Sequence, residues 1–263
     1  MATLYSNLPA SIFINNTEHH FASTSASVSL SAKLEDDRPL SSSPPLTFKV
    51  GGNLETKISL NFYAAKNVNF TAAEQVLSIF TGDIKGTIYI GGSSFNNCYL
   101  ENLSVEATPF LPVMMSADFI CLQTNQGIGL SNKNPNLNMP ESGICYGHNI
   151  SVQDGTFLTN TKESLSYKVS CNRTPVYTIG SDDATSCFLD SVSKEISIKS
   201  DNIKQFINYS SYGDILSVSL NTEDSQLLHQ ISFSNNSKIT SQNLSINAED
   251  VLAGQVTLRE IVL

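Results

Sequence analysis

The sequence has no tryptophan, few charged residues and no cluster of positive charge. Charged residues make up 15% of the 263 residues, and 24 acidic against 15 basic side chains give a formal net charge of −9. The densest run of charge, at 35–37 (Glu-Asp-Asp), is acidic. A groove that holds nucleic acid tightly needs clustered Lys and Arg to displace phosphate counterions. We therefore expect no tight binding of DNA or RNA.

Long apolar runs are also missing. No segment approaches the roughly 20 apolar residues of a membrane-spanning helix, and residues 1–5 lack the basic and apolar regions of a signal peptide. We expect neither membrane association nor secretion. Eight Asn-x-Ser/Thr triplets, including those at Asn15, Asn69, Asn102 and Asn149, are compatible with a secreted glycoprotein. Without a signal peptide, we interpret them as a product of the Asn- and Ser-rich composition.

The cysteines do not form a metal-binding or disulfide framework. They are odd in number, irregularly spaced and without a Cys-x-x-Cys pair, which argues against a zinc site. The five are Cys98, Cys121, Cys145, Cys171 and Cys187. We expect all of them to be reduced and most to be buried, in a protein made in a reducing compartment.

No catalytic or cofactor motif is complete. His19 and His20 are adjacent, so on a strand their side chains point to opposite faces, and we expect surface positions for both. The pair Cys145 and His148 is interpreted as an incidental loop pair rather than a catalytic dyad. Gly127-Ile-Gly129 lacks the third glycine of a dinucleotide loop. We expect no catalytic, cofactor-binding or metal-binding residue, and no cofactor.

Alternating apolar and polar residues predict a mostly β protein. Residues 28–34 (Val-Ser-Leu-Ser-Ala-Lys-Leu) and 165–169 (Leu-Ser-Tyr-Lys-Val) place every second side chain on one face. This period of two is typical of antiparallel sheets with one face on a core and one toward solvent.

An internal repeat organises these strands. Four pairs of segments match in the same order, at offsets of 137 to 141 residues: 12–14 with 150–152, 28–34 with 165–171, 57–60 with 195–198, and 102–105 with 243–246. We expect two tandem copies of one β domain, at 1–123 and 139–263, joined by a linker at 124–138. Arg38 and Arg173 follow the second matched segment in each copy. We expect each to make a structural ion pair or carbonyl hydrogen bond rather than a ligand contact.

Each copy also contains one candidate helix. Thr71 and Glu74 form a capping box before apolar residues that share a helical face, and a similar pattern occupies 200–207. The expected fold is a pair of β-barrel or sandwich domains, each with one short helix.

The last strand of each copy is long and apolar, at 113–121 and 256–263. We expect these closing strands to pair across the interfaces between subunits. The candidate inter-subunit residues are Met115, Ala117, Phe119, Val256, Leu258 and Val262.

Residues 170–181 (Ser-Cys-Asn-Arg-Thr-Pro-Val-Tyr-Thr-Ile-Gly-Ser) resemble a stretch in the structural tail proteins of large tailed phages. There, a strand ends in an Asn-Arg-x-Pro turn, and a Val-Tyr-x-Ile-Gly segment leads to the next strand. The end of the chain, a Leu-Ser-Ile strand followed by an acidic turn and a long closing strand, is similar to the end of phage tail-tube domains. The resemblance covers mainly 160–263.

The resemblance implies a virion structural protein of the tail tube or baseplate hub, made in the host cytoplasm and without catalytic role. In that family, six domains join side by side into a ring. Two domains per chain imply a homotrimer with pseudo-sixfold symmetry, a hexamer being the other possibility, in contact with other tail or baseplate proteins. Duplex DNA would pass without tight binding through a channel that we expect to be acidic.

Three other functions stay open. A β-sandwich binding module for carbohydrate or a host receptor usually exposes aromatic platforms, whereas the tyrosines here lie mostly within alternating segments. A secreted glycoprotein is opposed by the missing signal peptide. A hydrolase is opposed by the missing catalytic motifs.

Overall fold

The computed structural model describes most of the strand-forming sequence. The described residues are 10–14, 17–21, 23–31, 34–37, 47–50, 55–65, 85–91, 93–122, 143–153, 162–179, 183–200, 216–234, 237–246 and 252–262. Their elements are β1 (Ala10–Ile14), β2 (Thr17–Phe21), β3 (Ser23–Ser31), β4 (Leu34–Asp37), β5 (Thr47–Val50), β6 (Glu55–Tyr63), β7 (Gly86–Ile90), β8 (Ser93–Ala107), β9 (Met114–Cys121), a 3-10 turn (Gly147–Asn149), β10 (Ile150–Gln153), β11 (Lys162–Tyr177), β12 (Ala184–Ser200), β13 (Leu216–Asn221), β14 (Leu227–Phe233), β15 (Lys238–Ile246) and β16 (Leu252–Val262).

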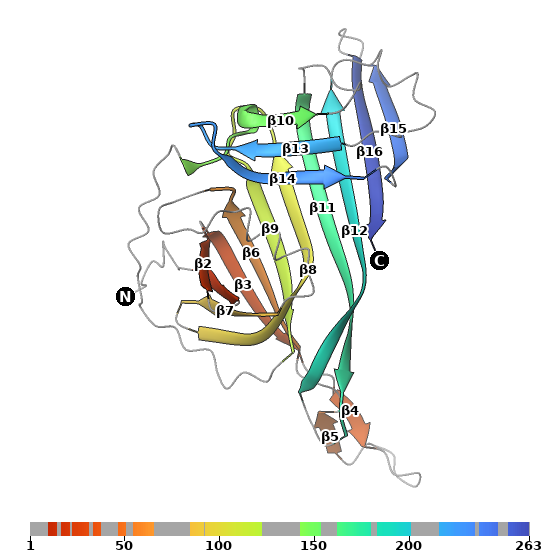
Figure 1. The fold of residues 1–263 in the computed structure, drawn as a ribbon. Helices are drawn as coiled ribbons and strands as arrows, with labels where there is room; N and C mark the ends of the chain where they lie inside the picture. The colour runs from red at the N-terminus through yellow and green to blue at the C-terminus, as the bar shows by residue number, and fades with distance from the viewer. Residues whose placement is uncertain are drawn as a thin grey trace.

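One antiparallel sheet dominates the molecule (Figure 1). Its strands follow the order β3-β6-β9-β8-β11-β12-β16-β15. The strands β7, β1 and β2 branch from the first part of β8, because β8 pairs with β7 there and with β11 only over 102–107. The strands β10, β13 and β14 form a separate sheet, and β4 pairs with β5.

The prediction of a mostly β protein with antiparallel sheets is confirmed, but no sheet of the described residues closes into a barrel. The candidate helix at 71–80 lies outside the described residues. The second candidate overlaps them only at Ser200, which ends β12, and the rest of it lies outside. The proposed linker at 124–138 also lies outside, so the division into two domains stays a prediction.

The strands of the main sheet pair in the same pattern in each half of the chain. In the first half, β6 lies between β3 and β9, and β9 also pairs with β8. In the second half, β12 lies between β11 and β16, and β16 also pairs with β15. The branch strands follow the same rule, since β1 pairs with β7 as β10 pairs with β13.

The register agrees residue by residue. Val28 lies opposite Ile58 in the first half, as Tyr167 lies opposite Ile196 in the second. Both halves skip one residue where β3 or β11 begins, between Ser23 and Ser25 and between Lys162 and Ser164. A second residue is skipped in β8, between Leu100 and Asn102, and in β15, between Ile239 and Ser241. The aligned positions in all these strands are 138 or 139 residues apart.

The two halves join directly, because β8 pairs with β11 in six consecutive positions. One hydrophobic core runs across this junction, from Ile58 and Phe119 in the first half to Tyr167 and Leu258 in the second. The halves are thus parts of one sheet with a shared core.

One face of the main sheet carries the main hydrophobic core, and a smaller cluster of buried apolar residues lies on the other face. The small sheet of β10, β13 and β14 crosses the upper part of the main sheet (Figure 1), where Phe233 of β14 makes an edge contact with Tyr167, ring centroids 6.0 Å apart. Phe21 of β2 packs on Phe62 of β6 at 4.8 Å. The smaller strands therefore cover the apolar face. On the other face, Tyr99 and Ile120 are buried in a second cluster with Ala184 and Cys187 of β12, and the rest of that face is open.

Two features of the second half differ from the sequence prediction. The segment Asn172-Arg173-Thr174-Pro175 does not form a turn, because β11 continues through it to Tyr177 with a register shift between Asn172 and Arg173. Beyond this shift β11 pairs only with β12. The two strands extend past the rest of the sheet as a distal arm, residues 172–179 and 183–190 (Figure 1).

Candidate functional site

The adjacent histidines on β2 occupy different environments. His19 lies opposite Ile12 and is only 3% exposed, whereas His20 lies opposite Ser11 and is partly exposed. Burial lowers the pKa of His19, and the neighbouring His20 lowers it further. The prediction of a surface position is therefore wrong for His19. Its Nδ1 atom is buried with no hydrogen-bond partner among the described residues.

Cys145 and His148 do not act on one another. Cys145 is completely buried, and burial raises the pKa of its thiol to about 12. His148 is exposed, with its ring stacked on Tyr146 at 5.8 Å and 6.0 Å from Phe110. A thiol held protonated at neutral pH is a poor nucleophile. Within the described ranges, no three His, Cys, Asp or Glu side chains could together hold a metal ion.

The prediction that all five cysteines are reduced is wrong. Cys98 and Cys121 lie opposite one another on β8 and β9, with their Cα atoms 4.0 Å apart, and form a disulfide. The remaining prediction, that the free thiols are buried, is confirmed for Cys145, Cys171 and Cys187. Disulfides persist in oxidising surroundings, so this pair does not fit the reducing compartment expected from the cysteine spacing.

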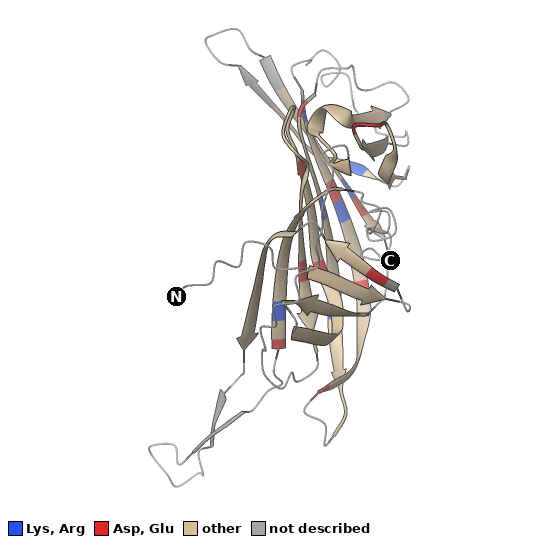
Figure 2. Cartoon of the chain, turned by 90° about the vertical axis from the view of Figure 1, so that its left-hand side faces the viewer, with Lys and Arg blue, Asp and Glu red and all other residues tan. Residues whose placement is uncertain are grey.

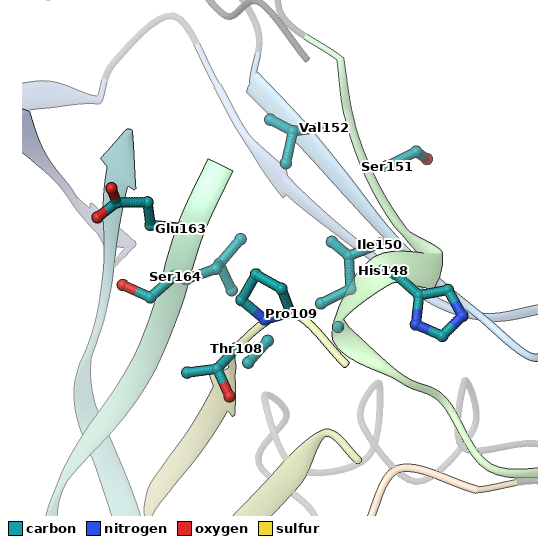
Figure 3. A pocket seen from close by; sticks show the side chains of 11 residues that line it. Thr108, Pro109, His148, Ile150, Ser151, Val152, Glu163 and Ser164 are labelled. Atoms are coloured by element: carbon teal, nitrogen blue, oxygen red, sulfur yellow. The ribbon is translucent and has the colours of Figure 1, made fainter. Parts of the chain in front are cut away.

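The best-defined pocket, of about 390 Å³, opens where the ends of β8 and β11 approach β10. Pro109 and Ile150 lie near its centre, with Glu163 and Ser164 at one end and His148 at the other (Figure 3). Glu163 forms an ion pair with Lys199 at 2.6 Å. The pocket thus holds no nucleophile aligned with a base, and the prediction of no enzymatic activity stays a prediction.

The closing strands do not present open edges. β9 pairs with β6 on one side and with β8 on the other over all its residues. β16 pairs with β12 over 254–262 and with β15 over 252–259. Five of the candidate inter-subunit residues are at most 2% exposed: Met115, Ala117, Phe119, Val256 and Leu258. Val262 pairs with Val192 of β12. These residues therefore lie in strands inside the sheet and not at an edge between subunits.

Among the described residues, the outer strands of the main run of the sheet are β3 and β15, and β2, at the end of the branch, is a third strand paired on one side only. Within the same ranges, β3 pairs only with β6, and β15 pairs only with β16. On β3, Leu30 is 48% exposed although it alternates in register with the partly buried Val28. These two strands lie at opposite ends of the main run. β3 corresponds to β11 of the second half, and β15 corresponds to β8 of the first half. Sequence alternation gave no signal that distinguished β3 and β15 from internal strands.

Most residues on the uncovered face of the sheet are polar. One row of paired residues crosses it from β3 to β16: Ser27, Ser59, Asp118, Asn102, Ser170, Ser193 and the exposed Ile261. Within this row the hydroxyl of Ser59 donates to a carboxylate oxygen of Asp118 at 2.7 Å. A second row contains Ser25, Asn61, Ser116, Ser104, Lys168, Glu195 and Arg259. We call this surface the polar face.

Charges on the polar face are mixed. The basic residues are Lys57, Lys168, Lys199, Lys238 and Arg259, and the acidic residues are Glu55, Glu106, Asp118 and Glu195. Figure 2 shows the two signs interspersed along the strands rather than gathered in a patch. The excess negative charge of the chain therefore lies largely elsewhere, and the expected acidic surface is not found on these strands.

Arg173 has the structural role that the sequence indicated. Its Nε donates to the carbonyl oxygen of Leu100 at 2.8 Å, and its guanidinium lies 5.3 Å from the ring centroid of Tyr99. The contact fixes the base of the distal arm against β8. Arg38 lies outside the described residues.

No family model and no curated protein matches the chain. In the part of the chain that the structure describes, no helix is long and apolar enough to cross a membrane.

Proposed function

We propose that the chain is a non-enzymatic structural protein of a phage tail, in the tube or the baseplate hub, and that three copies form a ring around a DNA channel. In this proposal, the chain is an internal duplication, and each half supplies four strands of a continuous sheet. The resemblance of residues 170–181 to phage tail proteins favours this function. The turn that the resemblance implied in this segment is absent, because β11 continues through it.

The observation that supports a ring most is the junction between the halves. The third strand of the first half, β8, pairs with the first strand of the second half, β11. This is a head-to-tail contact between two equivalent units, and repeating such a contact either closes a ring or extends a filament. One such contact lies within the chain, and the open edges β3 and β15 supply the next.

The size of the ring fits the proposal. Six halves of four strands, at a spacing of about 4.8 Å, give a circumference of roughly 115 Å and a backbone diameter of roughly 37 Å. The apolar face is covered by smaller strands, so the polar face lines the channel. Side chains narrow this opening further, and in this proposal the remaining channel admits duplex DNA.

The net charge indicated an acidic channel that repels DNA. The polar face would instead let DNA pass because it offers few cations that could bind phosphates. Its hydroxyl groups and mixed charges provide no run of cations to retain phosphates. Lys199 is held by Glu163 at 2.6 Å, and Lys57 lies 4.0 Å from Glu101. Nearby carboxylates therefore offset part of the positive charge that DNA would meet.

The assembly is tested by measuring mass and shape together. Native mass spectrometry of the purified chain, from micromolar to millimolar concentration, should show a trimer, and cryo-electron microscopy should show rings with pseudo-sixfold symmetry. Rings of six chains, or a chain that stays monomeric at millimolar concentration, contradict the proposal. A gel-shift assay at physiological salt should show no tight complex with duplex DNA.

A second function, a secreted β-sheet binding module, is favoured by the disulfide between Cys98 and Cys121. The two functions differ in glycosylation. The acceptor triplets at Asn102, Asn172 and Asn243 lie at exposed positions. Intact-mass analysis of the protein from its natural source should show no glycan if the tail proposal is correct. Glycans at these sites, on the polar face and at the β15 edge, would favour secretion and prevent ring closure.

A further inference from the structure

We infer that β15 of one copy pairs with β3 of the next copy, in the same register that joins β8 to β11 within the chain. The inference deepens the proposed function and rests on it in one respect, that copies of this chain associate edge to edge. It commits the two open edges to one partner, a second copy of this chain, and to one residue-by-residue alignment.

The register follows from the repeat in strand pairing. β8 and β15 hold equivalent places beside β9 and β16, and the aligned residues are 139 positions apart, as Ser104 and Asn243 are. β3 and β11 hold equivalent places beside β6 and β12, again 139 apart, as Ser29 and Lys168 are. Ser104 lies opposite Lys168 in the junction. The same junction between copies therefore places Asn243 opposite Ser29.

The full alignment mostly places residues of similar type opposite one another. The six internal pairs are Leu165–Ala107, Ser166–Glu106, Tyr167–Val105, Lys168–Ser104, Val169–Leu103 and Ser170–Asn102. The corresponding pairs between copies are Ala26–Ile246, Ser27–Ser245, Val28–Leu244, Ser29–Asn243, Leu30–Gln242 and Ser31–Ser241. Serines and asparagine meet on the polar face, and two of the three alternate pairs are apolar. A shift by one residue would mix the two faces.

The exposure of Leu30 marks the missing neighbour. Its equivalent on β11 is Val169, which lies opposite Leu103 of β8 and is 1% exposed. Leu30 holds the same place on β3, where no described strand covers the edge, and is 48% exposed. In the inferred register Gln242 lies opposite Leu30, so pairing with β15 would cover part of Leu30, whereas Leu103 of β8 covers Val169 more completely. Burial of apolar surface and completion of the open backbone ladder both favour the contact.

The repeated register shifts give the edges matching shapes. The shift at 100–102 precedes the part of β8 that pairs with β11, and the shift at 239–241 precedes the corresponding part of β15. Such irregularities bend and twist a strand. The outer edge of β15 therefore carries the same local bend as the edge of β8 that already accepts a copy of the β3-like strand.

The test is cysteine cross-linking of the full chain. In the double variant Ser29→Cys/Asn243→Cys, both thiols lie at directly opposed strand positions of neighbouring copies, within the Cα separation that a disulfide spans. Mild oxidation, in which the added oxidant takes two electrons and the thiols lose two protons, should link copies covalently. The matched control, Ser25→Cys/Asn243→Cys, moves one thiol about 13 Å along β3. We expect at least about tenfold less product from the control.

The outcomes separate the register from the ring. Covalent dimers and trimers that stop at three copies support both, whereas a ladder beyond three supports the strand junction and contradicts the trimeric ring. Trimers by native mass spectrometry that link no better in the S29C/N243C variant than in the control overturn the inferred register and leave the ring standing. A chain that neither assembles nor links at millimolar concentration contradicts both. Hydrogen exchange supplies a second measure, because assembly should protect the outward amides of β3 and β15 in the unmodified chain.

Discussion

Glu101 and Thr240 are the skipped residues of two register shifts that lie at the same place in the two halves of the sheet. Each follows a pairing with the neighbouring long strand, Leu100 with Phe119 and Ile239 with Leu258. Glu101 is also the residue whose carboxylate lies 4.0 Å from Lys57. Two sequences that share few identical residues thus interrupt their hydrogen-bond ladders at equivalent positions. The two halves of the sheet therefore agree more closely in strand geometry than in residue identity.

Removing the disulfide should destabilise the sheet. In Cys98→Ser/Cys121→Ser, the loop between two residues 23 positions apart is no longer closed in the unfolded chain. The expected loss of unfolding free energy is about 3 kcal/mol. Urea denaturation with and without reductant checks this, since reductant should lower the midpoint of the natural chain and leave the double variant unchanged. The same sensitivity to reductant in both would show that the bond is absent in solution.

Alternation along the sequence was sufficient to predict antiparallel sheet and its apolar face. Leu165, Tyr167 and Val169 face the core as their period of two requires. The same signal cannot report how many neighbours a strand has. Met115 and Leu258 read as apolar residues of a terminal strand, but both lie in strands that are paired on two sides. Edges depend on contacts between distant segments.

Other errors have the same origin. Cys98 and Cys121 show no motif, because their pairing results from the register of β8 against β9. Pro175 suggested a turn after Asn172, but β12 extends alongside β11 and keeps the segment extended, with Pro175 opposite Cys187. His19 was expected at the surface, but strands packed around β2 bury it. Its neighbours in the sequence do not reveal that packing. Local residue types carry none of this tertiary information.

Gly147 should tolerate no side chain. A Cβ atom there would lie 2.0 Å from the carbonyl oxygen of Thr108, and the backbone around it is held by a hydrogen bond of 3.0 Å from its amide to Leu111. Gly147→Ala should cost about 3 kcal/mol of unfolding free energy. Gly86→Ala is the comparison, because its Cβ atom would meet side-chain atoms of Ile12 and Ile14, both at 2.9 Å, rather than backbone. Urea midpoints should fall much further for Gly147→Ala, and equal losses would contradict the close backbone approach.

Stability should fall as pH decreases because of His229. Burial and the nearby Lys194 lower its pKa from 6.5 to about 4, and its Nδ1 is buried with no hydrogen-bond partner among the described residues. Between these values the unfolded chain binds a proton that the folded chain does not, so the stability present above pH 6.5 is lost as pH falls to 4. The loss is about 3 kcal/mol.

The measurement for His229 is urea denaturation at pH 7.5 and 4.5. His229→Gln should lose less stability over this range than the natural chain. The exposed His148 provides the control, since His148→Gln should keep the full dependence. If all three proteins lose the same free energy, other groups account for the acid sensitivity.

Arg173 should hold the distal arm without contributing much to the stability of the whole sheet. Its hydrogen bond to Leu100 and its position over Tyr99 join the arm to β8 just beyond the last β8–β11 pair. Lysine retains the charge in Arg173→Lys but loses the planar donor fork, so the local cost should be about 2 kcal/mol.

Hydrogen exchange resolves this local effect. In Arg173→Lys, amides of the distal arm should exchange roughly thirty-fold faster, because residues 172–177 pair only with β12 and can open separately from the core. Amides of β6 and β9 should keep their rates, because both strands are paired on two sides. Arg259→Lys, on the exposed polar face, is the matched control and should leave the arm unchanged. Equal acceleration across arm and core would instead mean that the arm opens only when the whole sheet unfolds.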